Sequence, residues 1–161
     1  MRFALLGAEL LKQDVYSNYS RTCNLRNDLI KEGFGFVGVQ NVAGARISQM
    51  FLVTGITDEN EAKVIAIAKN YGQKALLISN IVGNMEVVLT DENKSKGRTL
   101  LGKLKSVDKA SASLAQFYII FDENGQRYYY TTSSTTNRKE QRGKANSSNA
   151  RIQRSDQTGT L

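Results

Sequence analysis

Three polar side chains near the start of a predicted helix could bind an anion. Asn18, Ser20 and Arg21 open residues 17–32, a segment whose aliphatic residues recur at helical spacing. Backbone amides at a helix N-terminus favour anions, and a guanidinium group holds a carboxylate through two hydrogen bonds. Capping of the helix explains Asn18 and Ser20 equally well. The group therefore predicts either a carboxylate-binding site or a helix cap.

Two further polar residues, Ser48 and Gln49, open an otherwise apolar strand predicted over residues 48–54. A polar side chain in such a strand needs a hydrogen-bond partner. Gln49 could bind a ligand amide or hydroxyl, or it could end the strand at the surface. These two residues form the second candidate group.

The sequence contains no histidine and a single cysteine, Cys23. Ser-His-Asp triads, Cys-His pairs and histidine metal sites are therefore excluded. We expect Cys23 to be an inert packing residue, because no histidine is present to activate it. No metal and no cofactor is implied by the remaining residues. An enzyme made from this chain must use chemistry that needs no histidine.

The 161 residues divide by composition into residues 1–132 and residues 133–161. The second part holds six basic and two acidic residues, and so contributes +4 to the formal net charge of +7 of the chain. It has too few apolar residues to offset its ordering entropy. We expect one folded domain over 1–132, followed by a basic, polar and flexible tail over 133–161. Such a tail could neutralise nucleic-acid phosphates in a salt-sensitive way.

The N-terminus has the basic start of a signal peptide, but its apolar run is interrupted by Glu9 and no small-residue cleavage site follows. No segment approaches the roughly 18 apolar residues of a transmembrane helix. We therefore expect a cytoplasmic protein without a membrane partner.

The predicted elements follow the order βαββαβ, with further strands after them. We expect strands at 3–6, 34–42, 48–54, 74–79, 85–90, 117–121 and 127–132, helices at 17–32 and 57–71, and a long loop with room for one short helix at 91–115. Asn124-Gly125 predicts a type I′ turn between the last two strands.

This order predicts an α+β fold, a ferredoxin-like sandwich in which two helices cover one face of an antiparallel sheet. Several strands carry consecutive aliphatic residues, as in Leu76-Leu77-Ile78, and so are apolar on both faces. A sheet that is apolar on both faces predicts that copies of the chain associate through the second face.

The pattern of these residues resembles the phage enzymes that degrade S-adenosylmethionine. The resemblance covers roughly residues 3–130 and rests on order and spacing. It is carried by Asn18-x-Ser20-Arg21, Leu29, Gly33, a turn near Gly44, Ser48-Gln49-x-Phe51-x-Val53, Gln73 and the hairpin Phe117-x-Ile119-x-x-Glu123-x-Gly125-x-Arg127.

The resemblance implies a PII-like trimer of sandwiches with active sites between subunits. It implies a lyase in which the carboxylate of S-adenosylmethionine displaces methylthioadenosine and leaves homoserine lactone. In an infected bacterial host this reaction removes the methyl donor of restriction-modification systems. S-Adenosylmethionine or methylthioadenosine would be the ligand. The implied catalytic position is Gln49, and the implied substrate contacts are Asn18, Ser20, Arg21, Ser48 and Phe51.

One position departs from the family pattern. The family carries a functional glutamate at the start of the strand matched to 48–54, where this chain has Ser48 or Gln49. Glutamine has the shape of glutamate, so hydrogen bonds to ribose hydroxyls could survive, but its lack of charge removes the attraction for a sulfonium. A slower enzyme, a glutamate-to-glutamine engineered form and a diverged binding protein all fit this pattern.

Two functions of other classes also fit the sequence. One is a non-catalytic trimeric phage structural protein whose basic tail contacts nucleic acid or neighbouring subunits. The other is a PII-like regulator that binds a nucleotide without turnover.

Overall fold

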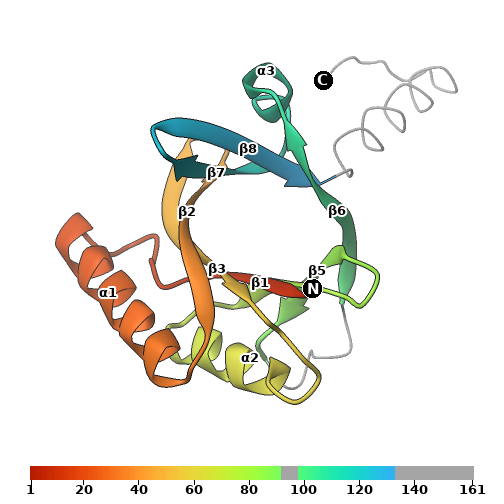
Figure 1. Ribbon diagram of the computed structural model, residues 1–161. Helices are drawn as coiled ribbons and strands as arrows, with labels where there is room; N and C mark the ends of the chain where they lie inside the picture. The colour runs from red at the N-terminus through yellow and green to blue at the C-terminus, as the bar shows by residue number, and fades with distance from the viewer. Residues whose placement is uncertain (92–97, 133–161) are drawn as a thin grey trace, which may run out of the picture.

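The computed structural model describes residues 1–91 and 98–132 of the chain (Figure 1). The basic tail predicted for residues 133–161, and the nucleic-acid contact predicted for it, lie outside the described residues. The elements are β1 (Phe3–Gly7), α1 (Val15–Lys31), β2 (Gly35–Ala43), β3 (Arg46–Thr54), α2 (Glu61–Asn70), β4 (Ala75–Ser79), β5 (Asn84–Leu89), β6 (Thr99–Val107), α3 (Lys109–Ala112), β7 (Phe117–Glu123) and β8 (Gln126–Thr132).

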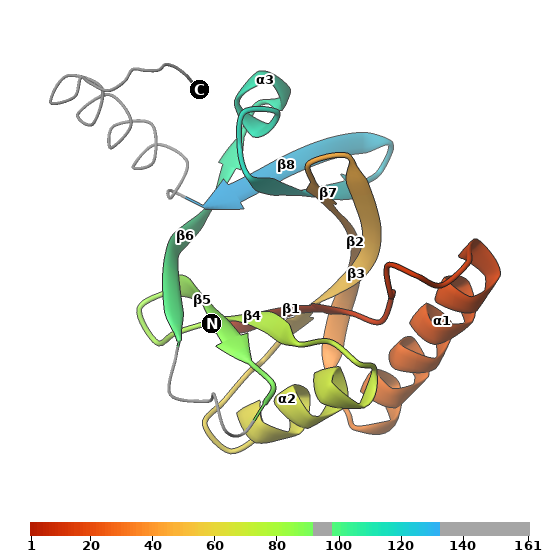
Figure 2. The same cartoon turned by 180° about the vertical axis from the view of Figure 1, so that it is seen from behind.

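The eight strands close into an antiparallel barrel in the order β1-β3-β2-β7-β8-β6-β5-β4. Closure comes from β1, which pairs with β3 along its whole length and also with β4. Figures 1 and 2 both show the strands as a ring, with α1 and α2 outside one side of it and α3 near the opposite side.

The predicted ferredoxin-like or PII-like sandwich, with two helices on one face of an antiparallel sheet, is therefore wrong. The missed element is β6, which lies in the segment predicted to be a loop and pairs with both β5 and β8. The C-terminal hairpin is joined to β2 through β7, and β6 fills the remaining gap in the ring between β8 and β5. The second apolar face of the sheet is the inside of this barrel, and it is covered within the chain.

The main core lies between the two longer helices and the outer face of the barrel. Alternate residues of a strand point to opposite faces, so Ala4 and Leu6 of β1 pack against the helices while Leu5 points into the barrel. Leu25 and Leu29 are the fully buried residues that α1 contributes. Val64, Ile67 and Ala68 of α2, together with outward residues of β3 and β4, complete this core.

The inside of the barrel holds a second, smaller core. Leu5, Val39 and Ile119 are its buried members. Partly buried residues pack around these three, namely Met50, Leu52, Leu77, Leu104, Phe117, Phe121 and Tyr130. An eight-stranded barrel is about wide enough to be filled by side chains or to hold one small ligand.

Local signals placed several elements correctly. Asn124 and Gly125 both have positive φ angles, 52° and 78°, which confirms the tight turn predicted between β7 and β8. The first helix begins earlier than predicted, because Asp14 is its N-cap and accepts a hydrogen bond of 2.7 Å from the amide of Ser17. No helix in residues 1–91 and 98–132 is long and apolar enough to cross a membrane.

Glu61, at the start of α2, ties β1 to this helix through arginine. Arg2 donates to Glu61 at 2.7 Å, and Arg98 also pairs with its carboxylate. Burial acts to raise the pKa of Glu61, but the hydrogen bonds from the two arginines outweigh it, and the pKa lies below its usual value. The carboxylate therefore stabilises the fold above the usual glutamate pKa, and this contribution is lost as the pH falls through the folded-state pKa.

Replacing Glu61 by glutamine is expected to make the free energy of unfolding fall less steeply as the pH is lowered, because the variant has no carboxylate to protonate at this position. Urea unfolding between pH 7 and pH 3 measures this slope for both proteins. The matched control is Glu59→Gln, which changes an exposed acid of the neighbouring loop and is expected to keep the wild-type slope. Equal slopes for Glu61→Gln and wild type would contradict the assignment.

Candidate functional site

The polar residues predicted on α1 bind the chain itself. Asn18 pairs with the backbone of Leu10, accepting from its amide at 2.9 Å and donating to its carbonyl at 3.0 Å. Arg21 donates to the carbonyl of Ala8 at 2.7 Å and to the carbonyl of Tyr71. Ser20 is exposed. Because the helix begins at Val15, these residues lie inside it and away from its first free amides.

These contacts meet on one short segment, the Ala8–Leu10 loop that follows β1. Gln73 joins them, since its side-chain amide donates to the carbonyl of Glu9 at 3.0 Å. Three side chains from two distant parts of the chain therefore hold three consecutive residues in place. The result is a fixed backbone position for Glu9.

Tyr71, which follows α2, makes further contacts with Arg21 and with Asp28 of α1. The guanidinium of Arg21 lies 5.7 Å from the centre of its ring, and its hydroxyl donates to Asp28 at 2.5 Å. Burial, with the hydrogen bond to the Asp28 carboxylate, raises the pKa of Tyr71 to about 12. The tyrosine is therefore neutral at physiological pH and acts as a hydrogen-bond donor between α1 and the end of α2.

The carboxylate of Glu9 lies beside the start of β3. It accepts a hydrogen bond of 2.8 Å from the backbone amide of Gln49, and its other oxygen is 4.0 Å from Arg46. The Glu9 side chain is 20% exposed. A glutamate carboxylate thus lies next to the position where the family resemblance implies one, but it comes from the loop after β1.

The three residues predicted on β3 have different surroundings. Ser48 accepts a hydrogen bond of 3.2 Å from Arg46. The side-chain amide of Gln49 donates to the carbonyl of Val39 at 3.1 Å. Phe51 is buried in the core under the helices, where its ring meets Phe36 edge-on at 5.2 Å. Phe51 therefore packs away from the other two.

A cavity of about 210 Å³ lies at this end of the barrel, and we call it the polar cavity. Its lining consists of Gly7, Glu9, Asn41, Ala43, Arg46, Ser48, Gln49, Met50 and Gln73. It holds a carboxylate, a guanidinium group and several amide and hydroxyl groups. Ser48 and Gln49 are the two predicted site residues that line it, whereas Asn18, Ser20, Arg21 and Phe51 do not.

A second cavity of about 300 Å³ adjoins the polar cavity inside the barrel, and we call it the inner cavity. Both are lined by Asn41 and Met50. The other residues of the inner cavity are mostly apolar: Leu5, Ala75, Leu76, Leu77, Val87, Leu101, Gln116 and Phe117. The side-chain oxygen of Asn41 is buried and has no hydrogen-bond partner among the described residues. It is an acceptor available to a ligand at the junction of the two cavities.

The sequence did not single out four polar residues of the polar cavity as ligand contacts: Glu9, Asn41, Arg46 and Gln73. The available signal was Glu9, a charged residue within the apolar run that begins at β1. A charge at such a position has to reach solvent or a partner. Within the described parts of the chain, no group of three or more histidine, cysteine, aspartate or glutamate side chains could hold a metal ion.

The arrangement suits recognition of a small molecule that carries one anionic and one cationic group. Arg46 supplies a donor for an anionic group, and Glu9 supplies an acceptor for a cationic one. The inner cavity would cover an apolar or aromatic part of the same molecule. Comparison with known proteins adds nothing to this geometry, because no family model and no curated protein matches the sequence.

Proposed function

We propose that this chain binds S-adenosylmethionine across the polar and inner cavities and degrades it as a lyase. The observation that carries the proposal is the junction at Asn41 and Met50, where a charged cavity opens onto an apolar one. S-Adenosylmethionine has the matching division. Its methionine part carries a carboxylate, an ammonium group and a sulfonium, and its adenosyl part is a flat aromatic base on a ribose.

Each part of the substrate has a complementary group in the cavities. Arg46 would bind the substrate carboxylate, because only one of its nitrogens is hydrogen-bonded within the described residues, to Ser48. Glu9 would bind the ammonium or sulfonium group. The free oxygen of Asn41 would accept a hydrogen bond from a ribose hydroxyl or from the amino group of adenine. Apolar residues such as Leu77 and Phe117 would cover the base.

The reaction asks little acid-base chemistry of the protein. A carboxylate oxygen of the substrate attacks its own Cγ, the O–Cγ bond forms, and the Cγ–S bond breaks with its electron pair left on sulfur. The products are homoserine lactone and methylthioadenosine. No proton has to move, so the absence of histidine is compatible with this step. The protein contributes by holding the methionine part in a conformation close to attack.

Glu9 would take the role of the glutamate found in that family, and Gln49 would hold the Glu9 carboxylate in place. The backbone amide of Gln49 holds the Glu9 carboxylate at 2.8 Å, while its side chain holds β2 through Val39. A carboxylate supplied by the loop after β1 would restore the charge that Gln49 lacks. In a bacterial host, such an enzyme would deplete the methyl donor of restriction-modification systems, as the resemblance implies.

Incubation of the purified full chain with S-adenosylmethionine is expected to yield methylthioadenosine and homoserine lactone, measured by liquid chromatography with mass spectrometry. Glu9→Gln is expected to lower kcat/KM by about 10- to 100-fold, the value of one hydrogen bond to a charged group. Glu123→Gln is the matched control, because Glu123 is exposed in the β7–β8 hairpin. Absence of methylthioadenosine with the wild-type protein would refute the lyase.

A further inference from the structure

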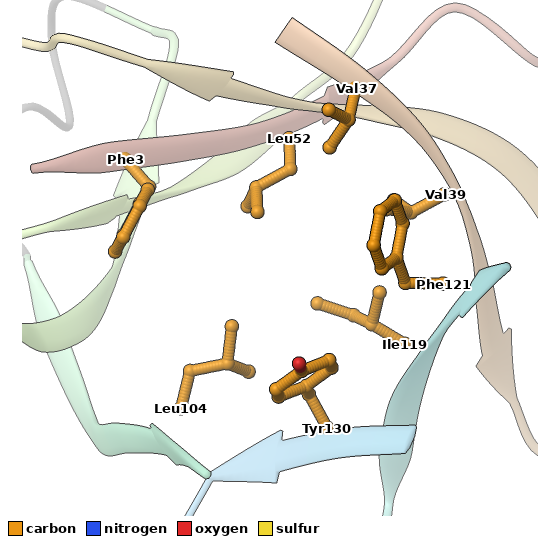
Figure 3. A pocket seen from close by; sticks show the side chains of 8 residues that line it. All are labelled: Phe3, Val37, Val39, Leu52, Leu104, Ile119, Phe121 and Tyr130. Carbon is orange, nitrogen blue, oxygen red and sulfur yellow. The ribbon is translucent and has the colours of Figure 1, made fainter. Parts of the chain in front are cut away.

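A third cavity, of about 310 Å³, lies inside the barrel and shares no lining residue with the polar or inner cavity. We call it the Tyr130 cavity. Figure 3 shows the eight side chains around it, which come from six strands: Phe3, Val37, Val39, Leu52, Leu104, Ile119, Phe121 and Tyr130. Seven of the eight are purely hydrocarbon side chains.

The strand register explains why these side chains meet. Leu52 pairs with Val37, and Ile119 pairs with Tyr130. Paired residues of antiparallel strands lie on the same face of the sheet, so each pair points into the barrel together. Figure 3 shows the side chains directed towards a common space from all sides.

The Tyr130 cavity and the inner cavity have different lining residues, and both are lined in part by one buried cluster. Leu5, Val39 and Ile119 form one buried cluster. Val39 and Ile119 line the Tyr130 cavity, and Leu5 lines the inner cavity. Val37 is 38% exposed, so solvent reaches the Tyr130 cavity at the end of the barrel remote from Glu9.

The chemistry of the lining restricts the ligand. Tyr130 carries the one polar side-chain atom among the eight lining residues. No hydrogen bond to its hydroxyl is made by residues 1–91 or 98–132, so it is available to a ligand. A charged molecule would lose its hydration here without gaining a counter-charge. Protein interiors are otherwise packed with few voids larger than water, and an apolar cavity of about half this volume already admits benzene.

We propose that the Tyr130 cavity binds an uncharged, mainly apolar small molecule with one polar group that hydrogen-bonds to the hydroxyl of Tyr130. The volume fits a molecule of two or three fused or linked rings, at the lower end of the usual range for ligand pockets. This site is independent of the lyase proposal, because no residue of one cavity lines the other.

The test uses the uncharged fluorescent probe N-phenyl-1-naphthylamine with the full chain. We expect a saturable rise in fluorescence with one site per chain. Leu104→Trp fills the cavity and is expected to weaken binding at least tenfold. Leu100→Trp, on the same strand but 59% exposed, is the matched control and is expected to bind as wild type does. Glu9→Gln should also leave binding unchanged, which separates this site from the proposed catalytic one.

The hydrogen bond from a ligand to the Tyr130 hydroxyl is tested separately, by competition with the fluorescent probe. Tyr130→Phe is expected to weaken competition by 1-naphthol about fivefold, the value of one neutral hydrogen bond, and to leave competition by naphthalene unchanged.

Far-UV circular dichroism checks that Leu104→Trp folds, and Val37→Leu provides a smaller filling change if it does not. Fluorescence that rises without saturation, or equal binding by the folded filling variant and wild type, would overturn the proposal.

Discussion

Replacing Arg21 by alanine is expected to lower the free energy of unfolding by about 3 kcal/mol. The guanidinium donates to the carbonyls of Ala8 and Tyr71, and Ala8 is fully buried. Removing the donor leaves both carbonyls without this partner, and hydrogen bonds to charged groups contribute about 1.5–3 kcal/mol each. The loss would also release the loop that carries Glu9. Urea denaturation followed by circular dichroism measures the change.

Two companion variants separate this role from a general effect of charge. Arg26→Ala removes an exposed arginine from the same helix and is expected to change stability by less than about 0.5 kcal/mol. Arg21→Lys keeps the charge but has a single ammonium group, so it cannot reproduce the forked donor geometry. It is expected to lose about half of the free energy lost in Arg21→Ala. Equal stability of Arg21→Ala and Arg26→Ala would show that the two carbonyl contacts contribute little.

Leu29→Ala is expected to destabilise the protein by about 2–5 kcal/mol, the range for deleting a large buried aliphatic side chain. Leu29 is fully buried between α1 and the outer face of the barrel. The neighbouring change Ile30→Ala should cost less than about 1 kcal/mol, because Ile30 is 52% exposed and alanine is the better helix former.

This pair of variants tests the orientation of α1 directly. Leu29 and Ile30 are adjacent and similar in volume, so their difference reports the face of the helix that is buried. Both are aliphatic residues of the predicted helix over 17–32, and the structure buries Leu29 while Ile30 is 52% exposed. Thermal and chemical unfolding of the two variants should rank them in that order. The reverse order would mean that the helix is rotated about its axis.

Most of the local elements could be predicted because their signals are local. Strand alternation, helical spacing and the Asn124-Gly125 turn each depend on a few neighbouring residues. The strand β6 could not be found in this way. Its register against β5 shifts between Met85 and Glu86, which pair with Gly102 and Leu100, so one extra residue interrupts the alternation. A bulge of this kind hides a strand from any pattern with a period of two.

The fold class was wrong for a related reason. Strands with consecutive aliphatic residues indicate that both faces are covered, but they do not indicate by what. The prediction assigned the second face to other copies of the chain. With β6 in place, the same residues, such as Leu5 and Leu77, form the inside of the barrel. Closure depends on pairs far apart in sequence, as between β6 and β8, and such pairing has no signature in a single segment.

The candidate site was predictable in part. Ser48 and Gln49, which were singled out as polar residues in an apolar strand, line the polar cavity. Asn18 and Arg21 were singled out because their side chains suit anions, yet backbone carbonyls and amides of the Ala8–Leu10 loop take their hydrogen bonds. Residue type alone cannot separate a ligand from a loop as the partner. Glu9 was recognised only as an interruption of an apolar run, because its contacts with Gln49 and Arg46 arise from tertiary structure.

Closure of the barrel also governs how this chain can meet other proteins. An open sheet presents a row of unpaired amides and carbonyls at each edge, and such edges recruit strands from other chains. Each of the eight described strands has neighbours on both sides, so this part of the molecule offers no edge for strand addition. Partners of residues 1–91 and 98–132 would therefore have to recognise side chains and not backbone groups. Self-association of this part would depend on exposed apolar side chains such as Ile81 and Val82 in the β4–β5 turn.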